Sequence, residues 1–492
     1  MSETASLNKT PMSYWIHSAV YLFLTFGMGY IPTESISSLG MSIVGIFIGM
    51  LYGWTFIGFI WPSMMSIFAL GVCGYFDTPQ LAFSNAFSNQ LVIFMLLILV
   101  FTAYFERSGI NKKIAAWFLS RPSVQGRPWF FTFMVLLATF VVGFLVDGNA
   151  VNFLIWNLLY GIFKEVDYRE GENYPAYLCA GVSFTALLSY GCKPWGNANI
   201  MAIGALQSAS GGIYSLNYVK FMLLAIPLCF LFLMGYFIVM KYIFKPDVKK
   251  LMSLSNDYLQ QLRNDLTLNI KEKIAAGALL VFISILLLIN ILPSSSSGIL
   301  GILSKGNFLS ALIVILIALN FSRLEGGPIL DFGGCAQKGI HWNVFWLNAA
   351  AMPVSAALSS DAAGITKWFG LMMNNYFIGV EAVVFIIAFT LLLLLATQVA
   401  FNMTLVVVAV PIVWQVCQTL GLNPLGVTVL ILMAISCAIA TPAASSNAAI
   451  MFSNVDWIGV PRSFKAGISA MLASMVILLG VGFPLVALIY GF

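Results

Sequence analysis

Four asparagines occupy paired positions in the two halves of the chain. Asn149 is followed 48 residues later by Asn197. In the same way, Asn402 precedes Asn447 by 45 residues. A carboxamide can donate hydrogen bonds to an anion or offer its oxygen to a cation, and it has no net charge to desolvate. Each asparagine alone could instead cap a helix break, but the pairing of all four favours a binding site.

Two ionisable residues lie beside these asparagines, inside otherwise apolar segments. Asp147 precedes Asn149 by two residues, and Lys193 precedes Asn197 by four. Ionisable groups inside a membrane are costly and usually functional. If the two residues pair with each other, their role is structural. If they do not, Lys193 offers a positive charge to an anionic substrate, and Asp147 is a proton or cation site.

Neighbouring polar groups complete the predicted site. The predicted substrate-binding residues are Asn149, Lys193, Asn197, Asn402, Thr404, Thr441, Pro442 and Asn447. The predicted ion-coupling residues are Asp147, Gly148, Ala400 and Ser445. The hydroxyl groups in this set could instead bond to helix carbonyls. The two histidines, His17 and His341, are expected near the ends of membrane spans, and the cysteines lack the spacing of a metal site.

Composition places these residues in a membrane protein. Of 492 residues, 60% are hydrophobic and 8% are charged, whereas soluble domains carry roughly 25% charged residues. The apolar stretches are long enough for helices that span a lipid bilayer or enter it partway, and they do not alternate as barrel strands would. We therefore predict an all-α polytopic membrane protein that lies in the lipid bilayer. Its basic residues are expected to lie in loops at the membrane and not to bind nucleic acid.

Loop charges predict how these helices cross the membrane. The loop 106–127 holds five basic residues against one acid, and the loop 164–172 is also charged. Because Lys and Arg are enriched in cytoplasmic loops, we place both loops in the cytoplasm. The apolar segment at about 129–163 then enters and leaves on the same side, which predicts a re-entrant hairpin. A broken helix is predicted to follow over about 175–206.

The second half repeats this organisation in the opposite orientation, with a hairpin at about 378–420 and a broken helix at about 424–453. Interrupted apolar segments at corresponding positions of two repeats are the best sequence indication of a transporter's central binding site. We expect about eleven transmembrane helices and two re-entrant hairpins, with a cytoplasmic N-terminus and an external C-terminus. The predicted divisions are 1–39 (tail and first helix), 40–245 (first inverted repeat), 246–273 (cytoplasmic linker) and 274–492 (second inverted repeat).

The residues at the tips and breaks resemble the divalent anion:sodium symporters, a family of dicarboxylate, citrate and sulfate carriers within the ion transporter superfamily. The tips read Gly-Asn-Ala at 148–150 and Phe-Asn-Met at 401–403. The breaks read Lys-Pro-Trp-Gly-Asn at 193–197 and run from Thr-Pro at 441–442 to Asn447. The resemblance implies a homodimer in which a scaffold stays fixed while a transport domain carries the substrate across like an elevator.

One departure from this family concerns the coupling ion. Members carry Ser-Asn-Thr at the tips, and the hydroxyl groups help to bind sodium and the substrate carboxylate. These hydroxyls are missing at positions 148, 150, 401 and 403. Coupling to Na⁺, coupling to H⁺ and exchange therefore stay open, and Lys193 could supply the charge that sodium otherwise provides.

We predict a secondary active transporter of a small organic anion, similar to a di- or tricarboxylate, in a bacterial inner membrane. The alternative is a cation/proton antiporter of the same superfamily that uses Asp147. The sequence lacks the nucleotide-binding loop GxxxxGK[ST] and the catalytic motifs HExxH and GxSxG, so we expect neither an enzyme nor a primary pump. No cofactor is expected beyond Na⁺ or H⁺ as coupling ion.

Overall fold

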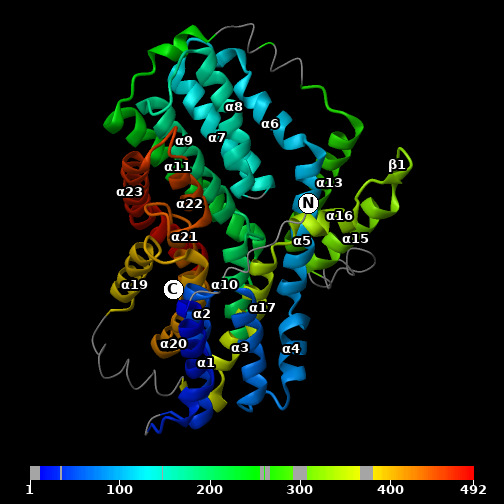
Figure 1. Ribbon diagram of the computed structural model, residues 1–492, viewed down its shortest axis with the longest axis vertical. Helices are drawn as coiled ribbons and strands as arrows, with labels where there is room; N and C mark the ends of the chain where they lie inside the picture. Colours follow the sequence, from blue (N-terminus) through cyan, green and yellow to red (C-terminus); the bar gives the residue numbers. More distant parts are fainter. Residues whose placement is uncertain are drawn as a thin grey trace, which may run out of the picture.

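The computed structural model describes residues 12–33, 36–146, 148–254, 260, 266–291, 307–365 and 381–492. Helices dominate these residues (Figure 1). The strands among them are β1 (Arg323–Leu324) and β2 (Gly327–Pro328), which pair antiparallel in one short hairpin. Asp147 lies outside the described residues.

The first half contains both arms of the first predicted hairpin and the broken helix that follows. Its helices are α1 (Met12–Gly27), η1 (Met28–Tyr30), α2 (Ser38–Phe56), α3 (Ile60–Val72), α4 (Pro79–Ser88), α5 (Gln90–Ser108), α6 (Ile110–Leu119), η2 (Pro122–Val124), α7 (Pro128–Leu145), α8 (Gly148–Glu165), α9 (Asn173–Gly191), α10 (Asn197–Ala209) and α11 (Tyr218–Ile238). The π-helical turn η3 (Val239–Phe244) extends α11, and η4 (Lys249–Ser253) begins the linker.

The second half has a similar order. Its helices are α13 (Ile270–Ile291), α15 (Asn307–Phe321), α16 (Phe332–Gly339), α17 (Trp342–Leu358), η5 (Asp361–Ala363), α19 (Ala382–Ala396), α20 (Asn402–Leu420), α21 (Pro424–Ile435), α22 (Ser446–Ser453), α23 (Val460–Ile477), the π-helical η6 (Leu478–Gly482) and α24 (Phe483–Tyr490). The predicted outer turn at Ser294–Ser297 and the start of the second hairpin at 378–380 lie outside the described residues.

Six helices of the described residues are long and apolar enough to cross a membrane. They are Ser38–Phe56, Gln90–Ser108, Pro128–Leu145, Tyr218–Phe244, Asn402–Leu420 and Val460–Tyr490. Four shorter apolar helices, Ile60–Val72, Leu309–Phe321, Ala382–Ala396 and Pro424–Ile435, accompany them. The predicted all-α membrane fold is confirmed, while the number of about eleven transmembrane helices and their inverted symmetry stay predictions.

The helix ends and starts fall close to the predicted tips and breaks. In the first half, α7 ends at Leu145 and α8 begins at Gly148, and α9 and α10 are separated by residues 192–196. In the second half, residues 397–401 separate α19 from α20, and residues 436–445 separate α21 from α22. The two halves interlock, because α22 packs against α8 and α9 while α10 packs against α20 and α21.

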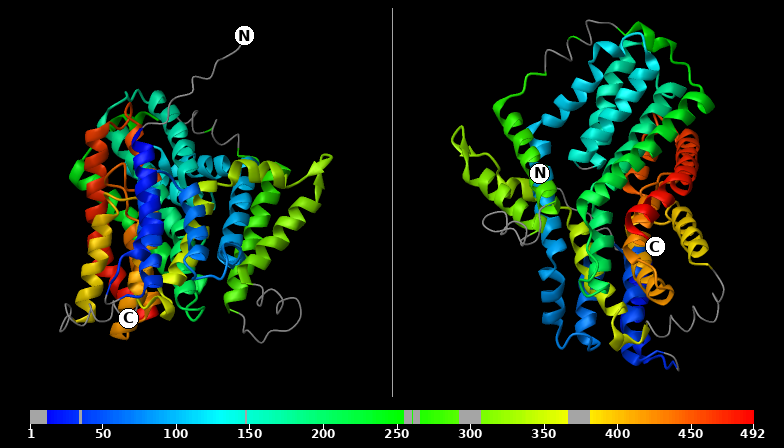
Figure 2. Two further views of the ribbon diagram at one scale, coloured as in Figure 1. Left: turned by 60° about the horizontal axis from the view of Figure 1, so that its bottom comes forward. Right: turned by 180° about the vertical axis from the view of Figure 1, so that it is seen from behind.

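A second group of helices flanks this interlocked centre. Helix α17 packs against α2, α3, α4 and α5 on one side, and against α10 and α20 on the other. Helices α13 and α15 pack on α5, and the β1–β2 hairpin at the end of α15 projects from the main body (Figure 2). Helix α17 therefore connects the flanking helices to the interlocked centre.

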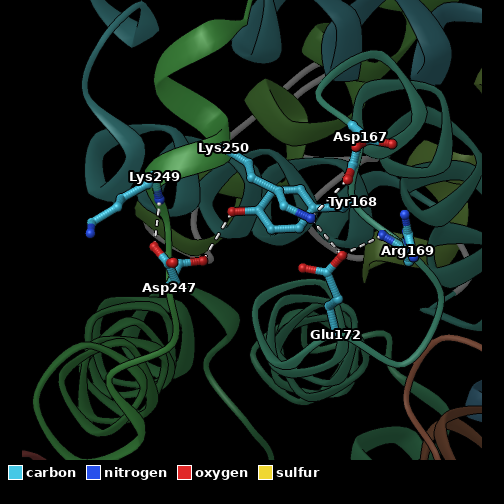
Figure 3. Close-up of polar contacts among 7 residues, drawn as sticks. All are labelled: Asp167, Tyr168, Arg169, Glu172, Asp247, Lys249 and Lys250. Atoms are coloured by element: carbon cyan, nitrogen blue, oxygen red, sulfur yellow. Dashed lines mark hydrogen bonds and ion pairs between the residues drawn. The ribbon is translucent and has the colours of Figure 1, made fainter.

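A polar cluster ties the loop between α8 and α9 to the start of the linker (Figure 3). Lys250 Nζ lies 2.7 Å from Glu172 Oε1 and donates to the carbonyl of Asp167 at 2.8 Å. The Tyr168 hydroxyl donates to the carbonyl of Asp247 at 3.0 Å. Burial raises the pKa of Glu172, but hydrogen bonds from Lys250 and from the backbone N–H of Arg169 outweigh this and hold it below its ordinary value of 4.5.

Candidate functional site

One cavity of about 260 Å³ lies where the starts of five helices meet. Residues of the first turns of α8, α10, α17, α20 and α22 line it, so the helices come from both halves of the chain. All four predicted asparagines are among the lining residues. The cavity is lined by Phe59, Gly148, Asn149, Leu187, Tyr190, Asn197, Ala198, His341, Asn343, Val344, Leu347, Phe401, Asn402, Met403, Ser445, Ser446 and Asn447.

The first-half wall is built by a tight turn between α9 and α10. A Cβ atom on Gly196 would lie 2.5 Å from the carbonyl oxygen of Tyr190, so glycine is required there. The Asn199 amide donates to the carbonyls of Gly191 and Lys193, at 2.8 Å each, and satisfies acceptors that the unwound helix leaves free. This turn places Asn197 at the cavity as the first residue of α10.

The second-half wall is held by backbone and hydroxyl contacts. The backbone N–H of Asn402 donates to the carbonyl of Ala444 at 3.0 Å, which joins the tip of the second hairpin to the break. Ser445 caps α22, since its Oγ accepts from the N–H of Ala448 at 3.1 Å and donates to the carbonyl of Ala438 at 2.7 Å. Asn402 and Asn447 are thereby held at the starts of their helices.

Asn152 connects the two walls, and sequence reasoning missed it. Its Nδ2 donates to Asn447 Oδ1 at 2.6 Å and to the carbonyl of Gly148 at 3.1 Å, and its side chain is fully buried. Because this bond occupies the oxygen of Asn447, the orientation inferred from the hydrogen bonds leaves its NH₂ group facing Gly148 and the cavity. The only sequence signal was the spacing of one helical turn from Asn149.

Lys193 lies beside the cavity and not on its wall. Its Nζ donates to the carbonyl of Val146 at 2.7 Å and to that of Gly143 at 3.3 Å, at the C-terminal end of α7. The ammonium group also lies 4.3 Å from the centre of the Tyr190 ring, and Tyr190 lines the cavity. A smaller void contacts Lys193, Tyr190 and Asn197 together. Tyr190 therefore contacts both the ammonium group of Lys193 and the cavity.

Both the oxygen and the nitrogen of the Gln398 amide make hydrogen bonds at the second break. Its Oε1 accepts from the N–H groups of Ile439 at 3.1 Å and Ala440 at 2.9 Å. Its Nε2 donates to the carbonyls of Leu394 at 2.9 Å and Cys437 at 3.2 Å. Thr441 adds a bond from its hydroxyl to the carbonyl of Gln398. These groups hold the break to the hairpin.

Apart from Asp147, which lies outside the described residues, the predicted site residues divide into two groups. Gly148, Asn149, Asn197, Asn402, Ser445 and Asn447 line the cavity. Lys193, Ala400, Thr404, Thr441 and Pro442 do not line it. Whether the residues of either group bind a substrate or an ion stays a prediction.

The cavity also has walls that sequence reasoning did not predict. Tyr190 comes from α9, and His341 and Asn343 come from the start of α17. His341 had been expected near a span end, and it is the N-cap residue of α17. Its place on the cavity depends on how α17 packs, and one sequence gives no signal for that. Among the described lining residues there is no Asp, Glu, Lys or Arg.

Comparison with protein families gives a decisive match. The model of the citrate transporter family, CitMHS, matches residues 43–432. The chain belongs to the citrate transporter family. This confirms the resemblance to carriers of divalent anions, and a member of the citrate transporter family is an integral membrane transporter and not an enzyme.

Individual relatives of this citrate transporter family member are distant. The sodium-dependent dicarboxylate transporter SdcS of Staphylococcus saprophyticus is 21% identical over 444 residues, which cover 87% of this chain and 82% of SdcS. An uncharacterized transporter of Synechocystis is 28% identical over 142 residues, covering 27% of this chain and only 23% of that protein. The structure of Neisseria gonorrhoeae MtrF, described as one of a class of antimetabolite efflux pumps, aligns with a TM-score of 0.58 at 13% identity over 96% of this chain and 95% of its own. This likeness concerns the fold alone.

Proposed function

We propose that the protein is a secondary transporter that binds a small di- or tricarboxylate in the cavity between its two halves. The observation that carries this proposal is the meeting of five helix starts and five asparagines, Asn343 of α17 included, at one cavity with no acidic residue among its described lining. An anion is the ligand that suits such a lining. The cavity volume of about 260 Å³ suits a small molecule.

Helix starts favour anions for a physical reason. The first N–H groups of a helix have no partner within it, and aligned peptide dipoles place roughly half a positive charge there. Five such ends face one cavity. Asn447 adds N–H donors, because its oxygen is already bonded to Asn152. The arrangement supplies positive potential without a permanent cation on the wall, which suits a site that must also release its ligand.

The carboxylate substrate class follows from the family and from SdcS. The matching family is that of citrate transporters, and the SdcS relatives are named as dicarboxylate transporters. SdcS is also named as sodium-dependent, which favours Na⁺ as coupling ion over H⁺ or plain exchange. Gly148 and Ser445 line the cavity and are the positions from which we propose an ion contacts the protein. The family does not favour the cation/proton antiporter as an alternative.

Transport requires the site to face both sides of the membrane in turn. We place the two hairpins and the two broken helices in a moving domain, and α17 with the flanking helices in a fixed scaffold. Inverted repeats, an elevator movement, a homodimer, a cytoplasmic N-terminus and an external C-terminus belong to this proposal. The bracing of each break to its hairpin supports movement of the four elements as one body.

A thermal-shift assay of the purified protein tests the proposal. Citrate, fumarate, succinate and sulfate are added with and without Na⁺, because a ligand present at 100 times its Kd stabilises by about 2.7 kcal/mol. At least one carboxylate is expected to raise the melting temperature, and more so with sodium. No shift with any of these anions would contradict the proposed function.

Asn447→Asp is the variant that tests the site itself. The aspartate retains an oxygen for the Asn152 bond but replaces the NH₂ group with a second oxygen and a negative charge. Carboxylate binding is expected to fall at least tenfold. Asn454→Asp is the matched control, since Asn454 ends the same helix away from the cavity and contacts the Tyr160 hydroxyl at 2.9 Å. Equal effects of both variants would argue against the site.

A further inference from the structure

His341 lines the cavity from a different helix than the four predicted asparagines. Those asparagines come from α8, α10, α20 and α22, whereas His341 precedes the first residue of α17, whose second residue, Asn343, also lines the cavity. Its side chain is exposed, and its imidazole makes no hydrogen bond or ion pair among those found in the described part of the chain. The ring is therefore available to a molecule in the cavity.

His341 is the one described lining residue with a basic side chain. The asparagines, Ser445 and Ser446 are neutral, and Tyr190 is a phenol. Lys193 Nζ lies 4.3 Å from the centre of the Tyr190 ring, and Lys338, in the last turn of α16, precedes His341 by three residues. The helices packed against α17 carry these titratable groups, none of which lines the cavity: Tyr52, Tyr104, Glu106, Arg107 and Cys417.

From this arrangement we infer that His341 is a specificity residue that contacts the second carboxylate of the bound anion and distinguishes dianions from monoanions by its charge. This inference rests on the proposed function. The amides and helix starts can hold one carboxylate by hydrogen bonds alone. A second carboxylate that leaves water needs a further donor or a positive charge.

A charge on His341 makes the binding of dianions depend on pH. A histidine side chain changes charge between about pH 5 and 8. A dianion therefore binds more tightly at the acidic end of this range, while a monoanion of the same shape is almost indifferent. The wall that holds His341 belongs to α17, so the contact is made only while the moving elements stand beside that helix.

Binding of a matched ligand pair measures this difference. Fumarate and crotonate share a trans four-carbon skeleton, but crotonate has a methyl group in place of one carboxylate, and the carboxyl groups of both are ionised from about pH 6 to 8. Isothermal titration of the full-length protein at fixed sodium is expected to give fumarate a Kd about tenfold lower at pH 6 than at pH 8, the effect of one charge-assisted hydrogen bond. The Kd of crotonate should change less than twofold.

Two substitutions at His341 separate charge from shape. His341→Gln should hold the Kd of fumarate at its high-pH value throughout, and His341→Lys should hold it at its low-pH value. His17→Gln is the matched control, because His17 is the other histidine of the chain and its Nδ1 lies 2.7 Å from the Tyr52 hydroxyl, away from the cavity. This variant should retain the pH dependence of the wild type.

The possible results separate the role of His341 from the function on which it rests. If the wild type binds fumarate but His341→Gln shows the same affinity and pH dependence, the role of His341 is overturned and the proposed function stands. That role is equally overturned if His341→Lys binds fumarate no better than the wild type at pH 8. If the wild type binds no organic anion, both the function and the role of His341 are wrong.

Discussion

The two helix breaks of this protein are braced in opposite directions by different residues. At the first break, Lys193 reaches out of the break and donates to the carbonyls of Gly143 and Val146 in the hairpin. At the second, Gln398 reaches out of the hairpin and bonds to the N–H groups of Ile439 and Ala440 in the break. One brace is charged and the other is neutral.

The difference follows from the backbone groups that each break leaves without partners. Unwound backbone inside a membrane must find its hydrogen bonds within the protein. The end of α7 presents carbonyls at the negative end of a helix dipole, so a lysine suits it. The second break presents N–H groups, and these need an acceptor such as the Gln398 oxygen. The bonds of Lys193 to the carbonyls of Gly143 and Val146 thus match the backbone groups that the end of α7 presents.

The largest effect is expected from Lys193→Met. Loss of two charge-assisted hydrogen bonds at a buried site should lower the free energy of unfolding by about 3 kcal/mol. Thermal unfolding in detergent measures the loss. Lys220→Met is the control, because Lys220 is an exposed lysine in the first turn of α11. Unchanged stability together with lost carboxylate binding would contradict the brace and favour a substrate contact.

A smaller loss is expected from Gln398→Leu at the neutral brace. The leucine has a similar volume but leaves the N–H groups of Ile439 and Ala440 without an acceptor, which should cost about 2 kcal/mol. Gln415→Leu is the matched control, because Gln415 is also buried but makes a single long bond of 3.5 Å to the carbonyl of Leu358. Similar melting temperatures for the two variants would show that the brace contributes nothing.

Asn152→Leu tests the contact between the halves. Without the Asn152 donor, the Asn447 amide can turn its oxygen toward the cavity. The expected loss of stability is about 1 kcal/mol, and the Kd of fumarate should rise about fivefold. Both are compared with Asn157→Leu, an exposed position on the same helix. If Asn152→Leu binds fumarate as tightly as this control, Asn152 does not position Asn447.

Much of the site could be predicted from the sequence because the cues were local. An asparagine at the end of an interrupted apolar segment marks a helix start, and all four asparagines do line one cavity. Asn152 and His341 could not be predicted, since each reaches the site through the packing of helices far apart in the chain. The hydrogen-bond partners of the Lys193 side chain could not be predicted either, because the residue type indicates a charge but not the carbonyl groups that it contacts.

The smallest effect on stability is expected from the ion pair of Lys250 and Glu172, which lies at the surface. Lys250 and Glu172 are 2.7 Å apart, as in the brace of Lys193, but their side chains are 41% and 32% exposed. Lys250→Gln should therefore cost no more than about 0.5 kcal/mol, and less in high salt, because water screens the pair. If Lys250→Gln lowers the free energy of unfolding as much as Lys193→Met does, burial does not determine how much these lysine contacts stabilise the protein.

The pH dependence of this surface pair has a defined sign. Since Glu172 has a pKa below its ordinary value of 4.5, its ionised form stabilises the folded state above that value. The contribution disappears as the pH falls through the lowered pKa, because the carboxyl group takes up a proton. Wild type and Glu172→Gln should therefore differ in melting temperature at neutral pH and converge as the pH falls through the lowered pKa. A difference that grows on acidification would contradict the role of the ion pair.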